Sequence, residues 1–235
     1  MSNPAEYTGS QVEAPWRGLY MAGGICAILY VILALFVPFF MFIGHTELSG
    51  MVSGKDVIRY ILENGQSWWV ILQTLVLGTS FFAIITFVAM FVALKDVARS
   101  TALIGSSIAI VIHILFIAYY PVLLAMGFVA DAYQLADESQ RSSFETAIEP
   151  LLAMNNAFNP LYESVFAVSI FILSMAMLKG VFAKRLAYLG FFSAIAGWVA
   201  LSLFPIVNIG YLWWWIFFMA WFVLIGIKLI KLGKS

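Results

Sequence analysis

LYMAGGICAILYVILALFVPFFMF, residues Leu19–Phe42, decides the fold class, because none of its side chains is charged. An apolar helix of about 20 residues is long enough to cross the hydrocarbon core of a bilayer. The rest of the chain has the same character: of 235 residues, 63% are hydrophobic and 10% are charged, against about 25% charged in soluble domains. We therefore predict an all-α polytopic membrane helix bundle, a single transmembrane domain over residues 1–235 with the lipid bilayer as its main partner.

Uncharged stretches divide the chain into six predicted transmembrane helices. The first predicted helix is expected to remain in the mature protein rather than to be cleaved as a signal peptide. A signal peptide has a basic start and an apolar run of only about 7–15 residues, whereas Glu6 and Glu13 precede this longer run. Asn159 and Pro160 suit the N-cap and first turn of the fourth helix. The sequence Phe204–Gly210 predicts the turn between the last two helices. The predicted spans cover residues 17–43, 67–94, 101–130, 160–178, 186–204 and 210–230.

Two long connections, residues 44–66 and 131–159, are predicted to hold short amphipathic helices that lie over the outer end of the bundle. In the first, Ser53 and Asp56 have the spacing of a capping box and precede an apolar stripe. Each amphipathic segment is too short to cross a bilayer.

The second connection repeats this pattern. Ser142 and Glu145 have the same spacing as the first capping box, and an apolar stripe follows. Pro150 interrupts that stripe, so the helix is expected to kink or split there.

Basic residues predict the orientation. Cytoplasmic loops of membrane proteins carry an excess of Lys and Arg, and placing the N-terminus inside puts nine of the chain's 12 basic residues on the inner side. We therefore predict a multi-pass protein of the cell (inner) membrane with a cytoplasmic N-terminus and a cytoplasmic C-terminus. The nine are Arg17, Lys95, Arg99, Lys179, Lys184, Arg185, Lys228, Lys231 and Lys234, against Lys55, Arg59 and Arg141 outside.

An internal repeat favours three helix hairpins that run in the same direction. RGLYMAGGICAI (17–28), RSTALIGSSIAI (99–110) and KRLAYLGFFSAI (184–195) share a basic residue followed by Gly and Ala four positions apart. Gly and Ala at this spacing let two membrane helices approach closely. The alternative is that membrane helices commonly begin with a basic residue and are rich in Gly and Ala. The predicted helix-packing residues are Gly23, Ala27, Gly105, Ala109, Gly190 and Ala194.

One ionisable side chain, His113, lies where the third predicted helix should be in hydrocarbon. An ionisable residue inside a span suggests a functional site. We predict that His113, Gln73, Tyr120 and Glu163 line an outward-facing polar pocket that binds a ligand. The alternative is that neutral His113 bonds a serine or a backbone carbonyl across a helix interface, while Glu163 faces outer water.

Other chemistries find little support in the sequence. Cys26 is the single cysteine, which excludes an intrachain disulfide. The two histidines, His45 and His113, lie at different depths, which disfavours a bis-histidine haem. Motifs for metal ligation, serine catalysis or nucleotide binding are absent, so we predict no cofactor, no metal site and no catalytic residue. A net charge of zero implies no nucleic-acid partner, and an enzymatic role is not favoured.

Three short motifs carry a family resemblance. ALKDV (93–97), MLKGV (177–181) and AYLG (187–190), together with six spans and two outer insertions, resemble a prokaryotic membrane family described as domain of unknown function 4386. The resemblance covers nearly the whole chain. It implies a six-span fold in a prokaryotic inner membrane and carries over no activity and no catalytic residue.

Two classes of function remain open at this stage. The first is small-molecule or ion binding at the outer polar pocket, as a transporter or a sensor. The second is a structural or accessory subunit whose small-residue helix faces dock a second copy in a homo-oligomer or a partner in a membrane complex.

Overall fold

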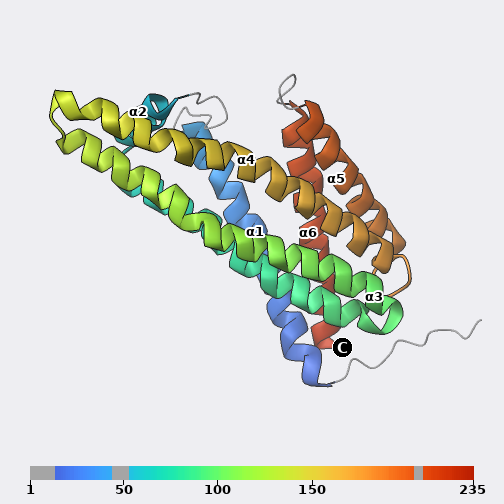
Figure 1. The fold of residues 1–235 in the computed structure, drawn as a ribbon. Coiled ribbons are helices and arrows are strands. Elements are labelled where there is room, and N and C mark those ends of the chain that lie inside the picture. Colours follow the sequence, from blue (N-terminus) through green and yellow to red (C-terminus); the bar gives the residue numbers. More distant parts are fainter. Residues whose placement is uncertain (1–13, 44–52, 204–208) are drawn as a thin grey trace, which may run out of the picture.

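The computed structural model describes residues 14–43, 53–203 and 209–235, and all regular elements in these ranges are helical (Figure 1). The predicted turn at Phe204–Gly210 lies largely outside the described residues, and His45 lies outside them altogether. The elements are the 3-10 helix η1 (Ala14–Trp16) and the α-helices α1 (Arg17–Ile43), α2 (Gly54–Asn64), α3 (Gln66–Leu135), α4 (Glu138–Met177), α5 (Lys184–Leu203) and α6 (Ile209–Lys234).

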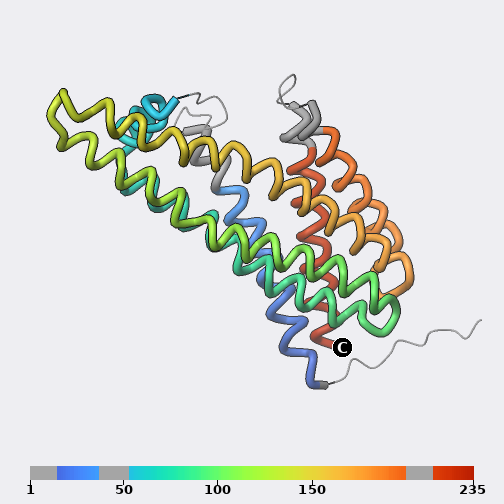
Figure 2. Tube along the Cα trace, in the orientation of Figure 1, coloured from blue at the N-terminus to red at the C-terminus, as the bar shows by residue number. Residues whose placement is uncertain are grey.

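The 70 residues of α3 form a hairpin. The backbone of Ala98 is not helical (φ −152°, ψ 48°), and the chain reverses direction at the corresponding place in Figure 2, so that the two halves lie side by side. The indole Nε1 of Trp69 in the first half donates a 2.9 Å hydrogen bond to the carbonyl of Leu123 in the second. The helices predicted over 67–94 and 101–130 are therefore both present, and the predicted connection between them shrinks to a sharp turn at Ala98.

Helix α4 corrects two predictions. It runs as one helix from Glu138 to Met177 with Pro150 and Pro160 in its interior. A separate amphipathic helix within residues 131–159 is therefore wrong, and so is a helix start at Pro160. Prolines are tolerated inside a helix when packed neighbours hold the chain on both sides, and Ile148 and Leu152 flank Pro150 as buried members of one apolar cluster with α2.

Helix α2 confirms the first predicted cap. Ser53 precedes the helix in extended conformation, and its hydroxyl accepts the Asp56 N–H at 3.3 Å. The predicted second cap is wrong, because Ser142 lies inside α4, where its carbonyl accepts a bond from Thr146. The residue spacing of a capping box also occurs inside long helices, so this spacing alone does not predict where α4 begins.

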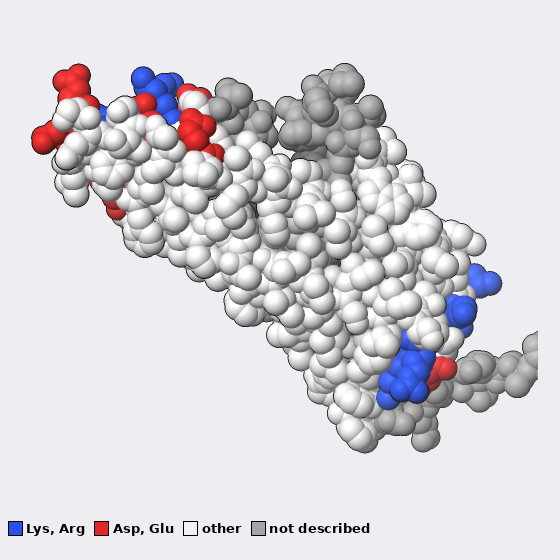
Figure 3. Space-filling view, viewed as in Figure 1, with Lys and Arg blue, Asp and Glu red and all other residues white. Residues whose placement is uncertain are grey.

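The two ends of the molecule differ in charge. In Figure 3 the acidic side chains gather mainly near α2 and the adjoining ends of α3 and α4, and the basic ones gather at the opposite end, with an uncharged surface between them. We call these the acidic end and the basic end. Four helices of the described chain, α1, α3, α4 and α6, are long and apolar enough to cross a membrane. The chain is accordingly a multi-pass membrane protein.

The helices enclose an aromatic interior. Helix α1 packs against α3 and α6, α4 packs against α3 and α5, and α5 packs against α6. Rings from three helices meet in the middle, where Phe87 lies 5.8 Å from Phe166 and 5.7 Å from Phe222 between ring centroids. Phe218 adds a ring 5.1 Å from Phe166. This interior surrounds the polar residues considered next.

Candidate functional site

His113 lies in the second half of α3 and is completely buried. Its Nδ1 lies 2.7 Å from the carbonyl oxygen of Ala109, one turn away on the same helix. Its Nε2 lies 3.1 Å from the hydroxyl of Tyr162 on α4. A neutral imidazole with a proton on Nδ1 satisfies both contacts, since Nδ1 then donates to the carbonyl and Nε2 accepts from the phenol. His113 thus joins two helices.

Aromatic rings enclose the imidazole. The ring centroid of Phe166 lies 5.0 Å away, that of Tyr162 5.6 Å away and that of Phe87 5.8 Å away. Both ring nitrogens are engaged and the side chain is completely buried among these rings, which matches the interhelical alternative weighed for this histidine more closely than an open ligand pocket.

Tyr120 contacts the first half of the α3 hairpin. The Tyr120 hydroxyl lies 3.2 Å from that of Thr74, in an exposed position that joins the two halves of α3. Gln73, next to Thr74, is buried. His113 and Tyr120 therefore have different partners.

Glu163 occupies a different setting from His113, although its neighbour Tyr162 contacts that histidine. It is partly exposed on α4, and Tyr30, a buried residue of α1, is close enough for an electrostatic interaction with its carboxylate. The Tyr30 ring in turn packs against Phe218 at 5.7 Å and Phe222 at 4.7 Å on α6. The carboxylate thus lies near the aromatic interior where α1, α4 and α6 approach one another.

The predicted packing residues lie at contacts within the chain. A Cβ added to Gly23 would collide with Ala89 of α3, and one added to Gly105 would approach the Leu173 side chain of α4 to 2.8 Å. One added to Gly190 would collide with Ser174 and lie 2.6 Å from the indole nitrogen of Trp221. The three alanines of the repeat, Ala27, Ala109 and Ala194, are completely buried.

Sequence reasoning missed Tyr30 as a neighbour of Glu163. Tyr30 precedes Val31, the position in the first hairpin that corresponds to His113 in the second, so the repeat offered a weak signal. Tyr162 was visible as a polar residue beside Glu163, but its role as the partner of His113 depends on how α3 and α4 cross. No cluster of three or more His, Cys, Asp or Glu that could hold a metal ion occurs among the described residues.

No family model matches the chain, and neither the curated proteins nor the solved structures contain a match. Membership of the family that the motifs resemble therefore stays a prediction, and function is argued from the chemistry of the described residues.

Proposed function

We propose that the chain is a six-span protein of a prokaryotic inner membrane that binds a small cation, organic or inorganic, at its outer side. The six proposed spans are α1, the two halves of α3, α4, α5 and α6. The excess of basic residues at one end supports placing that end, with both termini, in the cytoplasm.

The position of Glu163 is the observation that carries this proposal. Lys179 lies sixteen positions after Glu163, about 24 Å at ~1.5 Å per residue, which is less than the ~30 Å thickness of the hydrocarbon core. In Figure 1 the helix is also inclined relative to α1 and α6, which reduces the depth it covers. Glu163 is then within the outer part of the membrane, where a carboxylate is costly and suggests a functional site.

Aromatic rings near Glu163 favour a cationic ligand. Phe166 lies one turn further along α4 and contacts Phe218 of α6, and Trp214 stacks on Phe218 from one turn nearer the acidic end, with 6.4 Å between centroids. Tyr30 contacts the same phenylalanine. Faces of Trp, Tyr and Phe attract cations, so a carboxylate beside such rings suits an amine or a quaternary ammonium group.

The backbone conformation favours a sensor that binds the ligand over a transporter that moves it across the membrane. Many transporters bind substrate where a membrane helix is broken near the middle of the bilayer. The non-helical backbone of Ala98 and the positive φ angles of Gly65, Gly180 and Val181 all lie at turns of the described chain. The alternative of an accessory subunit loses its main support, because the small-residue faces meant for a partner pack within the chain.

Thermal unfolding of the detergent-solubilised full chain tests the proposal. The probes are choline, tetramethylammonium, a primary alkylamine and sodium, with acetate as an anionic comparison. A ligand at about 100 times its Kd stabilises a protein by about 2.7 kcal/mol, which for a chain of this size raises Tm by roughly 5–10 °C. We expect at least one cation to do so for the wild type and for Glu138→Gln, an exposed acid of the same helix.

Glu163→Gln should abolish that rise. Equal responses of the wild type and Glu163→Gln, or no wild-type response to any cation, would contradict the proposal. His113→Leu should lower the Tm without ligand, because the Tyr162 hydroxyl loses its partner, and should still respond to the cation. If His113→Leu lost the rise in Tm with the cation while Glu163→Gln kept it, the cation would bind at His113 and not at Glu163.

A further inference from the structure

Two turns at the basic end meet and carry cations outward. A Cβ added to Gly180, in the turn between α4 and α5, would lie 3.7 Å from Val97, next to the turn of the α3 hairpin. Ala98 and Phe182 from the same two turns are buried in the main core. The exposed cations of these turns, which we call the basic-turn patch, are Arg99, Lys179, Lys184 and Arg185.

The basic-turn patch differs from two other cations at the same end, Lys95 and Arg17, which have partners in the chain. Lys95 lies over the ring of Trp16 at 4.9 Å, and Arg17 donates a 2.8 Å hydrogen bond to the carbonyl oxygen of Ser235. Within the described part of the chain, the four patch residues make no side-chain hydrogen bond and no ion pair. One acid, Asp96, lies next to the α3 turn and is exposed, which leaves the patch with a net positive charge.

Exposed apolar side chains continue each side of the patch along the helices. Leu103 lies one turn beyond Arg99 on α3 and is 51% exposed. Tyr188 lies one turn beyond Lys184 on α5 and is 61% exposed, and Phe192 follows one turn later at 53%. A helix face that is cationic at its end and apolar further along has the same order of polarity as a phospholipid, from its headgroup to its acyl chains.

We infer that the basic-turn patch binds the headgroup of an anionic phospholipid, whose acyl chains lie along the exposed apolar faces of α3 and α5. Arginine donates paired hydrogen bonds to phosphate oxygens, and lysine adds mobile positive charge. A zwitterionic headgroup would bring its own ammonium group against the four cations, so net negative charge selects the ligand. This inference is independent of the proposed site at Glu163, because Glu163 lies inside α4, sixteen positions before Lys179, which is about 24 Å along a helix.

Lipid titration of the full chain in neutral detergent tests the inference. Phosphatidylglycerol is added to the wild type, to Lys179→Gln/Lys184→Gln, and to Lys55→Gln/Arg59→Gln as the matched control from the acidic end, and the rise in Tm is followed. Each Lys or Arg near an anionic surface contributes about a fivefold factor in affinity. The patch variant should therefore need at least about tenfold more phosphatidylglycerol for its half-maximal shift, while the control should match the wild type.

Two further additions identify what the patch recognises. Phosphatidylcholine and inorganic phosphate should each produce a much smaller shift than phosphatidylglycerol in the wild type. Equal shifts with either compound, or equal lipid requirements of the patch variant and the wild type, would overturn the inference. Size-exclusion profiles of the three proteins before lipid addition show whether the substitutions preserve the fold. If Lys179→Gln/Lys184→Gln does not fold, Arg99→Gln/Arg185→Gln is tested in its place.

Discussion

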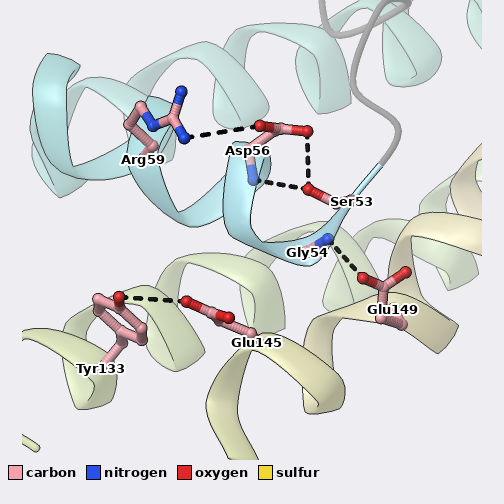
Figure 4. A network of polar contacts seen from close by, with 7 residues as sticks. All are labelled: Ser53, Gly54, Asp56, Arg59, Tyr133, Glu145 and Glu149. Atoms are coloured by element: carbon pink, nitrogen blue, oxygen red, sulfur yellow. Dashed lines mark hydrogen bonds and ion pairs between the residues drawn. The ribbon is translucent and has the colours of Figure 1, made fainter. Parts of the chain in front are cut away.

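Charged side chains at the acidic end and those of the basic-turn patch differ in their contacts with the rest of the chain. At the acidic end they contact the fold itself: Glu149 accepts the Gly54 N–H at 2.8 Å and Glu145 accepts the Tyr133 hydroxyl at 3.2 Å (Figure 4). At the basic end, the side chains of the basic-turn patch are exposed and make no hydrogen bond or ion pair with the described residues. We infer from this difference that acidic-end charges hold α2 in place, whereas those of the patch are available to a ligand.

The close approach of α2 to α4 should be the most sensitive feature of the acidic end. A Cβ at Gly54 would collide with the carbonyl oxygen of Glu145 and lie 3.3 Å from Ile148. Gly54→Ala should destabilise the docking of α2 by about 1–3 kcal/mol, because neither neighbour can easily move. Hydrogen exchange of the α2 amides measures this loss.

Gly18→Ala is the matched control for that substitution, since a Cβ at Gly18 meets no atom within 4 Å. It should leave the exchange of α2 unchanged. Equal protection of the α2 amides from exchange in Gly54→Ala and the wild type would show that α2 can shift on α4 without loss of stability. The proposed difference between the acidic end and the basic end would then lose support.

Removing the carboxylate that caps α2 should have the next largest effect. Glu149→Ala leaves the first N–H of the helix without its acceptor, which typically costs about 1–2 kcal/mol. The measurement is again hydrogen exchange of α2, with Glu138→Ala as the comparison because Glu138 is exposed on the same helix. A similar change of α2 exchange in both variants would show that the loss of a negative charge, and not the loss of the helix cap, destabilises α2.

Tyr133→Phe should have a smaller effect. It removes the hydroxyl that donates to Glu145 and keeps the ring under the Arg141 guanidinium, 5.5 Å from its centroid. The expected loss of unfolding free energy is about 0.5–1 kcal/mol, the contribution of one partly exposed hydrogen bond. SDS titration followed by tryptophan fluorescence measures it, and no change would mean that water replaces the bond at no cost.

The smallest effect should come from the basic end. Lys179→Gln/Lys184→Gln should change the unfolding free energy in lipid-free neutral detergent by less than about 0.5 kcal/mol, because neither lysine makes a side-chain hydrogen bond or ion pair with the residues that the structure describes. The same SDS titration checks this. A loss of 1 kcal/mol or more would show that these lysines stabilise the chain directly, as the acidic-end residues do.

Several features followed from the sequence alone. Long uncharged runs leave helices as the way to satisfy backbone hydrogen bonds in lipid, and α1 spans Arg17–Ile43 as predicted. The cap of α2 was predictable because Ser53 and Asp56 interact within one turn. The small residues of the repeat also lie where helices meet, since a small or missing side chain lets two backbones come closer together.

Other features depend on contacts between residues far apart in the chain. Pro150 carries a local penalty against helix, yet α4 continues because Ile148 and Leu152 on either side of it pack with residues of α2 and α3. His113 could have faced a ligand or a neighbouring helix, and the choice of Tyr162, 49 residues away, follows from how α3 and α4 rotate and cross. Local interactions thus determined the helices and one cap, whereas the partners of His113 and Glu163 required the assembled bundle, because helix crossing sums many weak contacts that no short stretch contains.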